Sequence, residues 1–155
     1  MGYHGDKLLD CLIIGGGPAG LTAMVYLARF HMNVTVVDAG EGRASWIPVS
    51  HNHAGFPEGI KGSVLIEKMA EQARLYGAAI KTSRVTRLDR DEEQSGFLAE
   101  WGSGPVAART VLIATGVRNR RPTMEPALHD DALCRGLIRY CRFATVTKSP
   151  TSASG

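Results

Sequence analysis

Three glycines near the N-terminus have the type and spacing that bind the phosphates of a dinucleotide. Gly15, Gly17 and Gly20 satisfy G-x-G-x-x-G directly after the apolar residues 11–14. In this motif the first glycine makes a tight turn, the second lets backbone approach a pyrophosphate, and the third lets a helix pack closely on a strand. A pyrophosphate would then lie on the free N–H groups at the start of that helix, where the helix dipole favours negative charge.

The elements around this turn fit the same chemistry. Pro18 suits a first helical turn, because its missing N–H would have no intrahelical partner, and a helical pattern follows over residues 19–31. A second apolar run, 34–37, ends in Asp38, which is 18 positions after Gly20 and close to the offset of about 20 residues for an acid that binds a ribose hydroxyl. An acid there favours a free 2′-hydroxyl and argues against NADP. A plain glycine-rich loop and a strand-end turn residue at position 38 remain the alternatives.

The composition excludes several classes of protein. The chain has 155 residues, of which 44% are hydrophobic and 21% charged, as in one ordinary globular domain. No apolar stretch approaches the roughly 18 residues of a membrane helix, and residues 1–10 lack the apolar core of a signal peptide, so we expect a cytoplasmic protein with no membrane partner. The net charge is only +3, and no interleaved aromatics support nucleic-acid binding.

The cysteines and histidines indicate neither a disulfide framework nor a metal site. An odd number of cysteines, 3 in all, without a secretion signal argues against a disulfide scaffold. Cys11 lies in the first expected strand, and we expect it to be a small buried hydrophobe. His51 and His53 could be two metal ligands, but the spacing suggests no third one, so we expect no metal.

The middle of the chain predicts a long loop, a helix and several strands. Residues 40–62 form the loop, and its buried-looking aromatics, Trp46 and Phe56, favour a function over disorder. A helix follows over residues 63–76, with Gly77 as the residue that ends it. Short strand-like segments separated by turns then predict a small antiparallel meander beside the main sheet; these segments are 79–82, 84–89, 96–101 and 106–109. Residues 110–114 form another apolar strand.

The order of these motifs resembles the FAD-binding domain of flavoproteins with two dinucleotide-binding domains, and most closely the thioredoxin reductase-like branch. The resemblance runs from about Leu9 to Cys141 and rests on Gly-Gly-Gly-Pro-Ala-Gly at 15–20 and Ile-Ala-Thr-Gly at 113–116. It implies an α/β fold, namely a Rossmann-type parallel sheet with flanking helices and a small antiparallel β-meander. It also implies electron transfer from NAD(P)H through FAD to a disulfide or similar acceptor.

The same resemblance assigns contacts with FAD to five segments of the chain. The residues concerned are Gly15, Gly17, Pro18, Ala19, Gly20, Asp38, Asn52, Val85, Ala114, Thr115 and Gly116. Asp38 would hold the adenosine ribose, where the family more often has a glutamate, and the backbone of Val85 would meet the adenine. Asn52 would contact the isoalloxazine ring, although an asparagine there could equally cap a turn.

The resemblance stops at the redox motif. Residues 136–141 resemble the lead-in to the family's C-x-x-C, but Ala144 stands where the second cysteine belongs. A dithiol–disulfide cycle needs a resolving partner, so we expect Cys141 to be the first cysteine of a broken, non-functional motif. The sequence holds no second G-x-G-x-x-G, and we therefore expect that the NAD(P)H domain and the family's returning C-terminal segment are missing.

These points predict a truncated chain with three parts. We expect the N-terminal part of an FAD-binding domain over 1–117, a connector toward a missing NAD(P)H-binding domain over 118–141, and a disordered, frame-shifted tail over 142–155. Restoring one C ahead of the codons CGG TTT GCG ACG would encode Pro-Val-Cys-Asp after Cys141, and sequencing the DNA there tests this hypothesis. The alternatives are a non-enzymatic cofactor-binding remnant and an NAD-binding Rossmann protein. The full-length family could form homodimers.

Overall fold

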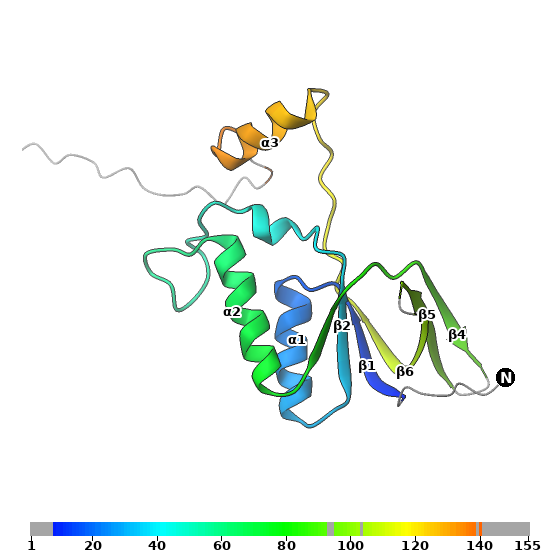
Figure 1. Ribbon diagram of the computed structural model, residues 1–155. Coiled ribbons are helices and arrows are strands. Elements are labelled where there is room, and N and C mark those ends of the chain that lie inside the picture. Colours follow the sequence, from blue (N-terminus) through cyan, green and yellow to red (C-terminus); the bar gives the residue numbers. More distant parts are fainter. Residues whose placement is uncertain (1–7, 93–94, 103, 139, 141–155) are drawn as a thin grey trace, which may run out of the picture.

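The computed structural model describes residues 8–92, 95–102, 104–138 and 140, and its helices and strands are drawn in Figure 1. Along the chain the elements are β1 (Leu9–Ile14), α1 (Pro18–Arg29), β2 (Val34–Asp38), the 3-10 helix η1 (Arg43–Trp46), α2 (Gly62–Leu75), β3 (Ala79–Thr82), β4 (Arg87–Asp91), β5 (Gly96–Trp101), β6 (Gly104–Ile113) and α3 (Pro126–Cys134).

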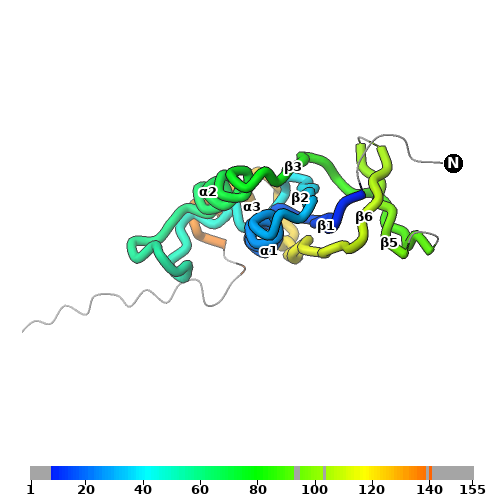
Figure 2. The backbone as a smooth tube through the Cα atoms, turned by 90° about the horizontal axis from the view of Figure 1, so that it is seen from below, coloured from blue at the N-terminus to red at the C-terminus, as the bar shows by residue number. Residues whose placement is uncertain are grey.

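One six-stranded sheet has the order β3-β2-β1-β6-β5-β4. The strands β3, β2, β1 and β6 run parallel, with Cys11 opposite Val34 on one side and opposite Thr110 on the other. The strands β6, β5 and β4 are paired antiparallel. This arrangement confirms the expected α/β fold, a Rossmann-type parallel sheet joined to an antiparallel meander. Figure 2 shows α2 and β5 on opposite sides of β1.

Three details of the expected strands were wrong. The strand expected over 84–89 begins later, because β4 runs from Arg87 to Asp91. Residues 79–82 pair parallel with β2, so β3 is the edge of the Rossmann half and not part of the meander. Residues 106–109 and 110–114 are not separate strands, because β6 runs without a break from Gly104 to Ile113. Its first half pairs with β5 and its second half with β1, so one strand joins the two halves of the sheet.

The core has two layers because successive residues of β1 face opposite sides of the sheet. Cys11 and Ile13 pack with α1 and α2, in a cluster that includes Met24. Leu12 packs on the other face with residues of the meander, among them Val106. Both faces of β1 are therefore covered, and Leu12 and Ile13 are fully buried. Cys11 is buried as expected.

The helices begin and end within two residues of the expected positions. The helix α1 starts at Pro18 and stops at Arg29 instead of residue 31, because Phe30 leaves the helical conformation and His31 has a φ of 59°. Gly77 follows α2 with a φ of 80°, which confirms it as the residue that ends this helix. In the described part of the chain, no helix is long and apolar enough to cross a membrane.

The long loop differs from the expectation of buried aromatics. Trp46 is 42% exposed, and the guanidinium of Arg121 lies over its ring, 5.3 Å from the ring centroid. The side chain of His51 contacts the position where a Cβ on Gly59 would stand, so it packs within its own turn. Among the described residues, no group of three or more His, Cys, Asp or Glu side chains could hold a metal ion.

Candidate dinucleotide site

The turn between β1 and α1 can be built only with glycine at two positions. Gly15 has a φ of 111°, and a Cβ there would collide with the carbonyl oxygen of Ala114. A Cβ on Gly20 would collide with the carbonyl oxygen of Gly15. Hydrogen bonds fix the same corner, because Gly15 donates to the carbonyl of Val37 at 2.8 Å and Ala114 donates to that of Ile14 at 2.8 Å. The turn is therefore locked between the ends of β2 and β6.

Gly17 serves a different purpose, since nothing lies within 4 Å of the position that its Cβ would occupy. It is the N-cap of α1, with no side-chain cap and no acidic residue in the first turn, and Pro18 follows as expected. Pro18 and Ala19 are exposed. The positive end of the helix dipole thus faces open space over Gly17, and this arrangement suits an anionic group such as a pyrophosphate.

Asp38 lies at the end of β2, directly beside the turn. Its carboxylate Oδ1 accepts a hydrogen bond of 3.0 Å from the backbone N–H of Gly16. A cavity of about 440 Å³ opens here, and its lining includes Gly16, Asp38, Thr82 and side chains of α2 such as Glu67. A carboxylate that borders a cavity next to a phosphate-binding turn is suited to accept hydrogen bonds from ribose hydroxyls.

The segment after β6 comes to the same place. Ala114 touches the turn at Gly15, as described above, while Thr115 and Gly116 are exposed. Gly116 has a φ of 68° and open space at its Cβ position. The carboxyl ends of β1, β2 and β6 therefore meet here, and β1 is the strand at which the order of the sheet reverses. Open α/β sheets bind their ligands at such a switch point.

Two other residues that are expected to bind FAD, Val85 and Asn52, make no contact with the glycine turn among the contacts of the described residues. The half-buried Val85 packs against the meander side of the core. Asn52 is exposed, and its Oδ1 accepts a hydrogen bond of 2.7 Å from the hydroxyl of Ser50. Their contacts with FAD remain predictions. Cys141 lies outside the described residues.

Sequence reasoning missed Gly16 and an ion pair between the segments that follow β2 and β3. A Cβ on Gly16 would stand 2.8 Å from the Cβ of Asp38, and the run of three glycines was the signal for it. Arg84 pairs with Glu41 at 2.7 Å, which joins the loop after β2 to the segment after β3. The hydrogen bond and the charge of Arg84 hold the pKa of Glu41 below its usual range.

The glycine turn at the switch point, with a carboxylate on the neighbouring strand, defines a dinucleotide-binding domain of the Rossmann type. The family model described as pyridine nucleotide-disulphide oxidoreductase matches residues 9–151. The chain belongs to this family, and within it the chain is thioredoxin reductase-like.

Individual relatives agree with this assignment. The chain is 36% identical over 118 residues to a thioredoxin reductase of Pneumocystis jirovecii, covering 71% of this chain and 36% of that protein. It is 32% identical over 147 residues to a thioredoxin reductase of Yarrowia lipolytica, covering 84% of this chain and 46% of that protein. The solved thioredoxin reductase of Streptococcus pyogenes superimposes with a TM-score of 0.71 at 28% identity, over 77% of this chain and 39% of that one. The chain thus spans less than half the length of these relatives.

Proposed function

We propose that this chain is the FAD-binding part of a thioredoxin reductase-like oxidoreductase that passes electrons from NAD(P)H through FAD to a disulfide or similar acceptor. The observation that carries the proposal is the corner where Gly17 faces open space and Asp38 borders a cavity, at the carboxyl ends of β1, β2 and β6. FAD would supply the hydride and electron-transfer chemistry, and the protein would bind and orient it.

The described residues divide this binding task between them. The backbone at Gly17, Pro18 and Ala19 would hold the pyrophosphate through the N–H groups at the start of α1. Asp38 would accept hydrogen bonds from the adenosine ribose, and Gly16 would hold its carboxylate in place. We further propose that Ala114, Thr115 and Gly116 lie along the cofactor, that the Val85 backbone meets the adenine, and that Asn52 contacts the isoalloxazine ring.

We propose that the 155-residue chain itself does not turn over. Its sequence has Ala144 at the position of the resolving cysteine, so a disulfide formed by Cys141 with a substrate has no partner at C-x-x-C spacing to release it. A cytoplasmic location, and homodimers in longer members of the family, stay predictions from the sequence.

Cofactor titration tests the proposed function, because FAD and NAD share the adenosine and pyrophosphate that this corner would bind. The purified chain is titrated with each cofactor separately, and FAD binding is followed by the quenching of flavin fluorescence. We expect saturable FAD binding and NAD binding that is weaker by about tenfold or more, which corresponds to roughly 1.4 kcal/mol. A folded chain that binds NAD and not FAD would contradict the proposal in favour of an NAD-binding Rossmann protein.

A further inference from the structure

A second cavity opens between α3 and the segment that contains η1. Its volume is about 510 Å³, which lies within the range of roughly 300–1,000 Å³ of small-molecule sites. Residues 45–48 form one wall, and Leu133 and Cys134 of α3 belong to the other. Lys61 and Ser63, at the start of α2, complete the lining. Ser63 also borders the cavity of the dinucleotide site, so the two cavities are neighbours.

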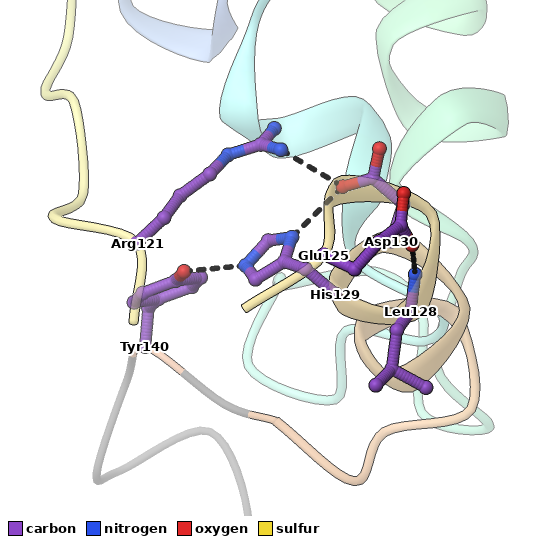
Figure 3. Close-up of polar contacts among 6 residues, drawn as sticks. All are labelled: Arg121, Glu125, Leu128, His129, Asp130 and Tyr140. Carbon is purple, nitrogen blue, oxygen red and sulfur yellow. Dashed lines mark hydrogen bonds and ion pairs between the residues drawn. The ribbon is translucent and has the colours of Figure 1, made fainter. Parts of the chain in front are cut away.

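Arg121 ties the two walls of this cavity together. Its guanidinium lies over the ring of Trp46, 5.3 Å from the ring centroid. The same group donates a hydrogen bond of 3.1 Å to Oδ1 of Asp130 on α3 (Figure 3). The first wall is also fixed to α2, because the N–H of Gly62 donates to the carbonyl of Ile47 at 2.9 Å. Specific contacts therefore hold the cavity open between its two walls.

Lys61 gives the cavity a positive charge that is free to bind a ligand. In the part of the chain that the structure describes, Lys61 makes no ion pair. It is the N-cap residue of α2, but its side chain makes no capping hydrogen bond. The first turn of α2 contains no acidic residue, so the positive end of the helix dipole adds to the charge of the lysine.

Among the described residues that line the cavity, Asp130 is the one acid. Its Oδ1 lies 2.8 Å from Nδ1 of the buried His129 and accepts the hydrogen bond from Arg121, as Figure 3 shows. The hydrogen bond with His129, and to a smaller extent the charge of Arg121, lower the pKa of Asp130. The carboxylate is thus ionised at neutral pH, but Arg121 offsets its charge. Lys61 therefore determines the sign of the net charge around the cavity.

The walls around these charges are mostly apolar. The side chains of Trp46 and Ile47 are 42% and 37% exposed, Pro48 is exposed as well, and Leu133 is half-buried. An indole ring can stack against a flat aromatic group, and covering the aliphatic side chains adds a hydrophobic contribution. Apolar walls with one free ammonium group are complementary to a ligand with a flat apolar body and one anionic group.

We propose that this cavity binds a planar aromatic carboxylate, with its ring between Trp46 and Leu133 and its carboxylate paired with Lys61. The inference goes beyond the proposed function, because none of the residues that line the cavity belongs to the expected contacts with FAD. A ligand in this cavity lies next to the dinucleotide site, at Ser63, and leaves the glycine turn free.

Titration calorimetry of the 155-residue protein with 2-naphthoate, in the absence of flavin, tests the proposal. The matched probe is 2-naphthamide, which keeps the two rings and lacks the charge. We expect 2-naphthoate to bind about tenfold more tightly than 2-naphthamide, because the carboxylate forms a charge-assisted hydrogen bond with Lys61. Octanoate carries the charge without a ring, so it should also bind more weakly than 2-naphthoate.

Lys61→Met removes the ammonium group and keeps most of the aliphatic stem. We expect this variant to fold, because the Lys61 side chain makes no capping hydrogen bond. Its affinity for 2-naphthoate should fall about tenfold, while its affinity for 2-naphthamide should stay unchanged. Lys68→Met is the matched control, since Lys68 is exposed on the same helix and does not line the cavity. This control should bind both probes as the unmodified protein does.

Cys134 reports where the ligand binds, because its exposed thiol belongs to the lining of the cavity. Saturating 2-naphthoate should slow the alkylation of Cys134 by iodoacetamide at least about threefold, measured by mass spectrometry of its peptide. Cys11 is buried and shows in the same experiment that the domain stays folded.

An absence of measurable 2-naphthoate binding, or equal affinities for 2-naphthoate and 2-naphthamide, would overturn the inference. So would a Cys134 that saturating 2-naphthoate leaves unprotected. Displacement of 2-naphthoate by FAD would also count against it, because the cavity would then belong to the cofactor. Failure of FAD to bind, in contrast, would contradict the proposed function and would leave the 2-naphthoate result as it stands.

Discussion

The carboxylate of Asp38 accepts a hydrogen bond of 3.0 Å from the backbone N–H of Gly16. This contact joins the end of β2 to the glycine turn after β1, and it engages Oδ1. Under the proposed function, a ribose bound in the adjoining cavity would need acceptors at this carboxylate, and the hydrogen bond from Gly16 would keep the carboxylate in position for it. The short side chain of aspartate fits the close approach of these two segments, since a Cβ on Gly16 would stand 2.8 Å from the Cβ of Asp38.

Asp38→Asn separates the two roles of this carboxylate. Asparagine can still accept from Gly16 through its carbonyl oxygen, so we expect the variant to fold, but its NH₂ replaces a carboxylate oxygen and the charge is lost. A hydrogen bond to a charged group contributes about 1.5–3 kcal/mol, so FAD affinity should fall by roughly 10- to 100-fold. Fluorescence titration with FAD measures this change.

Asp89→Asn is the control, because Asp89 pairs with Arg87 on β4 at the surface. Equal FAD affinity in the two variants would exclude Asp38 as a ribose ligand.

Gly15→Ala and Gly17→Ala should damage different properties of the protein. Alanine at position 15 would need a φ of 111° and would collide with the carbonyl of Ala114, so we expect a loss of stability of at least about 1–2 kcal/mol. Alanine at position 17 meets nothing within 4 Å and has a φ of −76°, so the stability cost should stay within about 1 kcal/mol.

The added methyl group at position 17 would, however, project into the space left for the pyrophosphate. Urea unfolding and FAD titration of both variants separate the two effects. We expect Gly15→Ala to lower the unfolding midpoint, and Gly17→Ala to weaken FAD binding about tenfold with little change in that midpoint. A Gly17→Ala variant that binds FAD normally would show that the pyrophosphate does not lie over this glycine.

The parts of the fold that sequence could predict are those with local signals. The β1–α1–β2 unit was predictable from two such signals, the glycines at 15, 17 and 20 and the apolar runs of β1 and β2. A tight turn requires particular residues at particular positions, and a strand buried on both faces requires consecutive apolar residues. The pairing of β3 with β2 has no local sequence signal. Lys81 and Thr82 are exposed, so β3 lacks the apolar run of a buried strand, and its parallel pairing with β2 depends on the path of the chain through α2. The continuity of β6 could not be predicted either, because its two halves pair with different strands and therefore have different sequence patterns.

The functional residues show the same division. In the candidate site, Asp38 was predictable from its spacing after Gly20. On α3, the contacts of His129 with Asp130 and Tyr140 were not predictable. Tyr140 reaches His129 only after the turn at Gly136 reverses the chain, and no periodic pattern connects Arg121 with its partner Asp130. The one local signal in this region was Glu125-Pro126, which is typical of a helix start and which α3 follows.

The 155-residue chain should not reduce a disulfide with NADPH. Its sequence contains one G-x-G-x-x-G and no second cysteine at C-x-x-C spacing after Cys141, so neither a second nucleotide motif nor a resolving thiol is available. The assay follows NADPH absorbance with FAD and an aromatic disulfide present, and a chain with Gly15→Ala gives the background. Consumption of NADPH above that background would refute the expectation of an inactive chain.

Acid should weaken the hydrogen bond between Asp130 and His129 on α3, where Nδ1 of His129 lies 2.8 Å from Oδ1 of Asp130. The pKa of Asp130 is lowered from 3.8 in the folded chain, mainly by its hydrogen bond with His129. A depressed carboxylate pKa stabilises the fold in full above the unfolded value, near pH 4, and this contribution is lost as the pH falls through the lower folded value. The α3 amides of the unmodified chain should therefore be better protected from hydrogen exchange than those of Asp130→Asn at pH 7, and this difference should disappear well below pH 4.

Asp131→Asn serves as the control, since the exposed ion pair of Asp131 with Arg135 contributes little to stability. A difference between the unmodified chain and Asp130→Asn that persists undiminished to pH 2 would show that the charge of Asp130 does not stabilise α3.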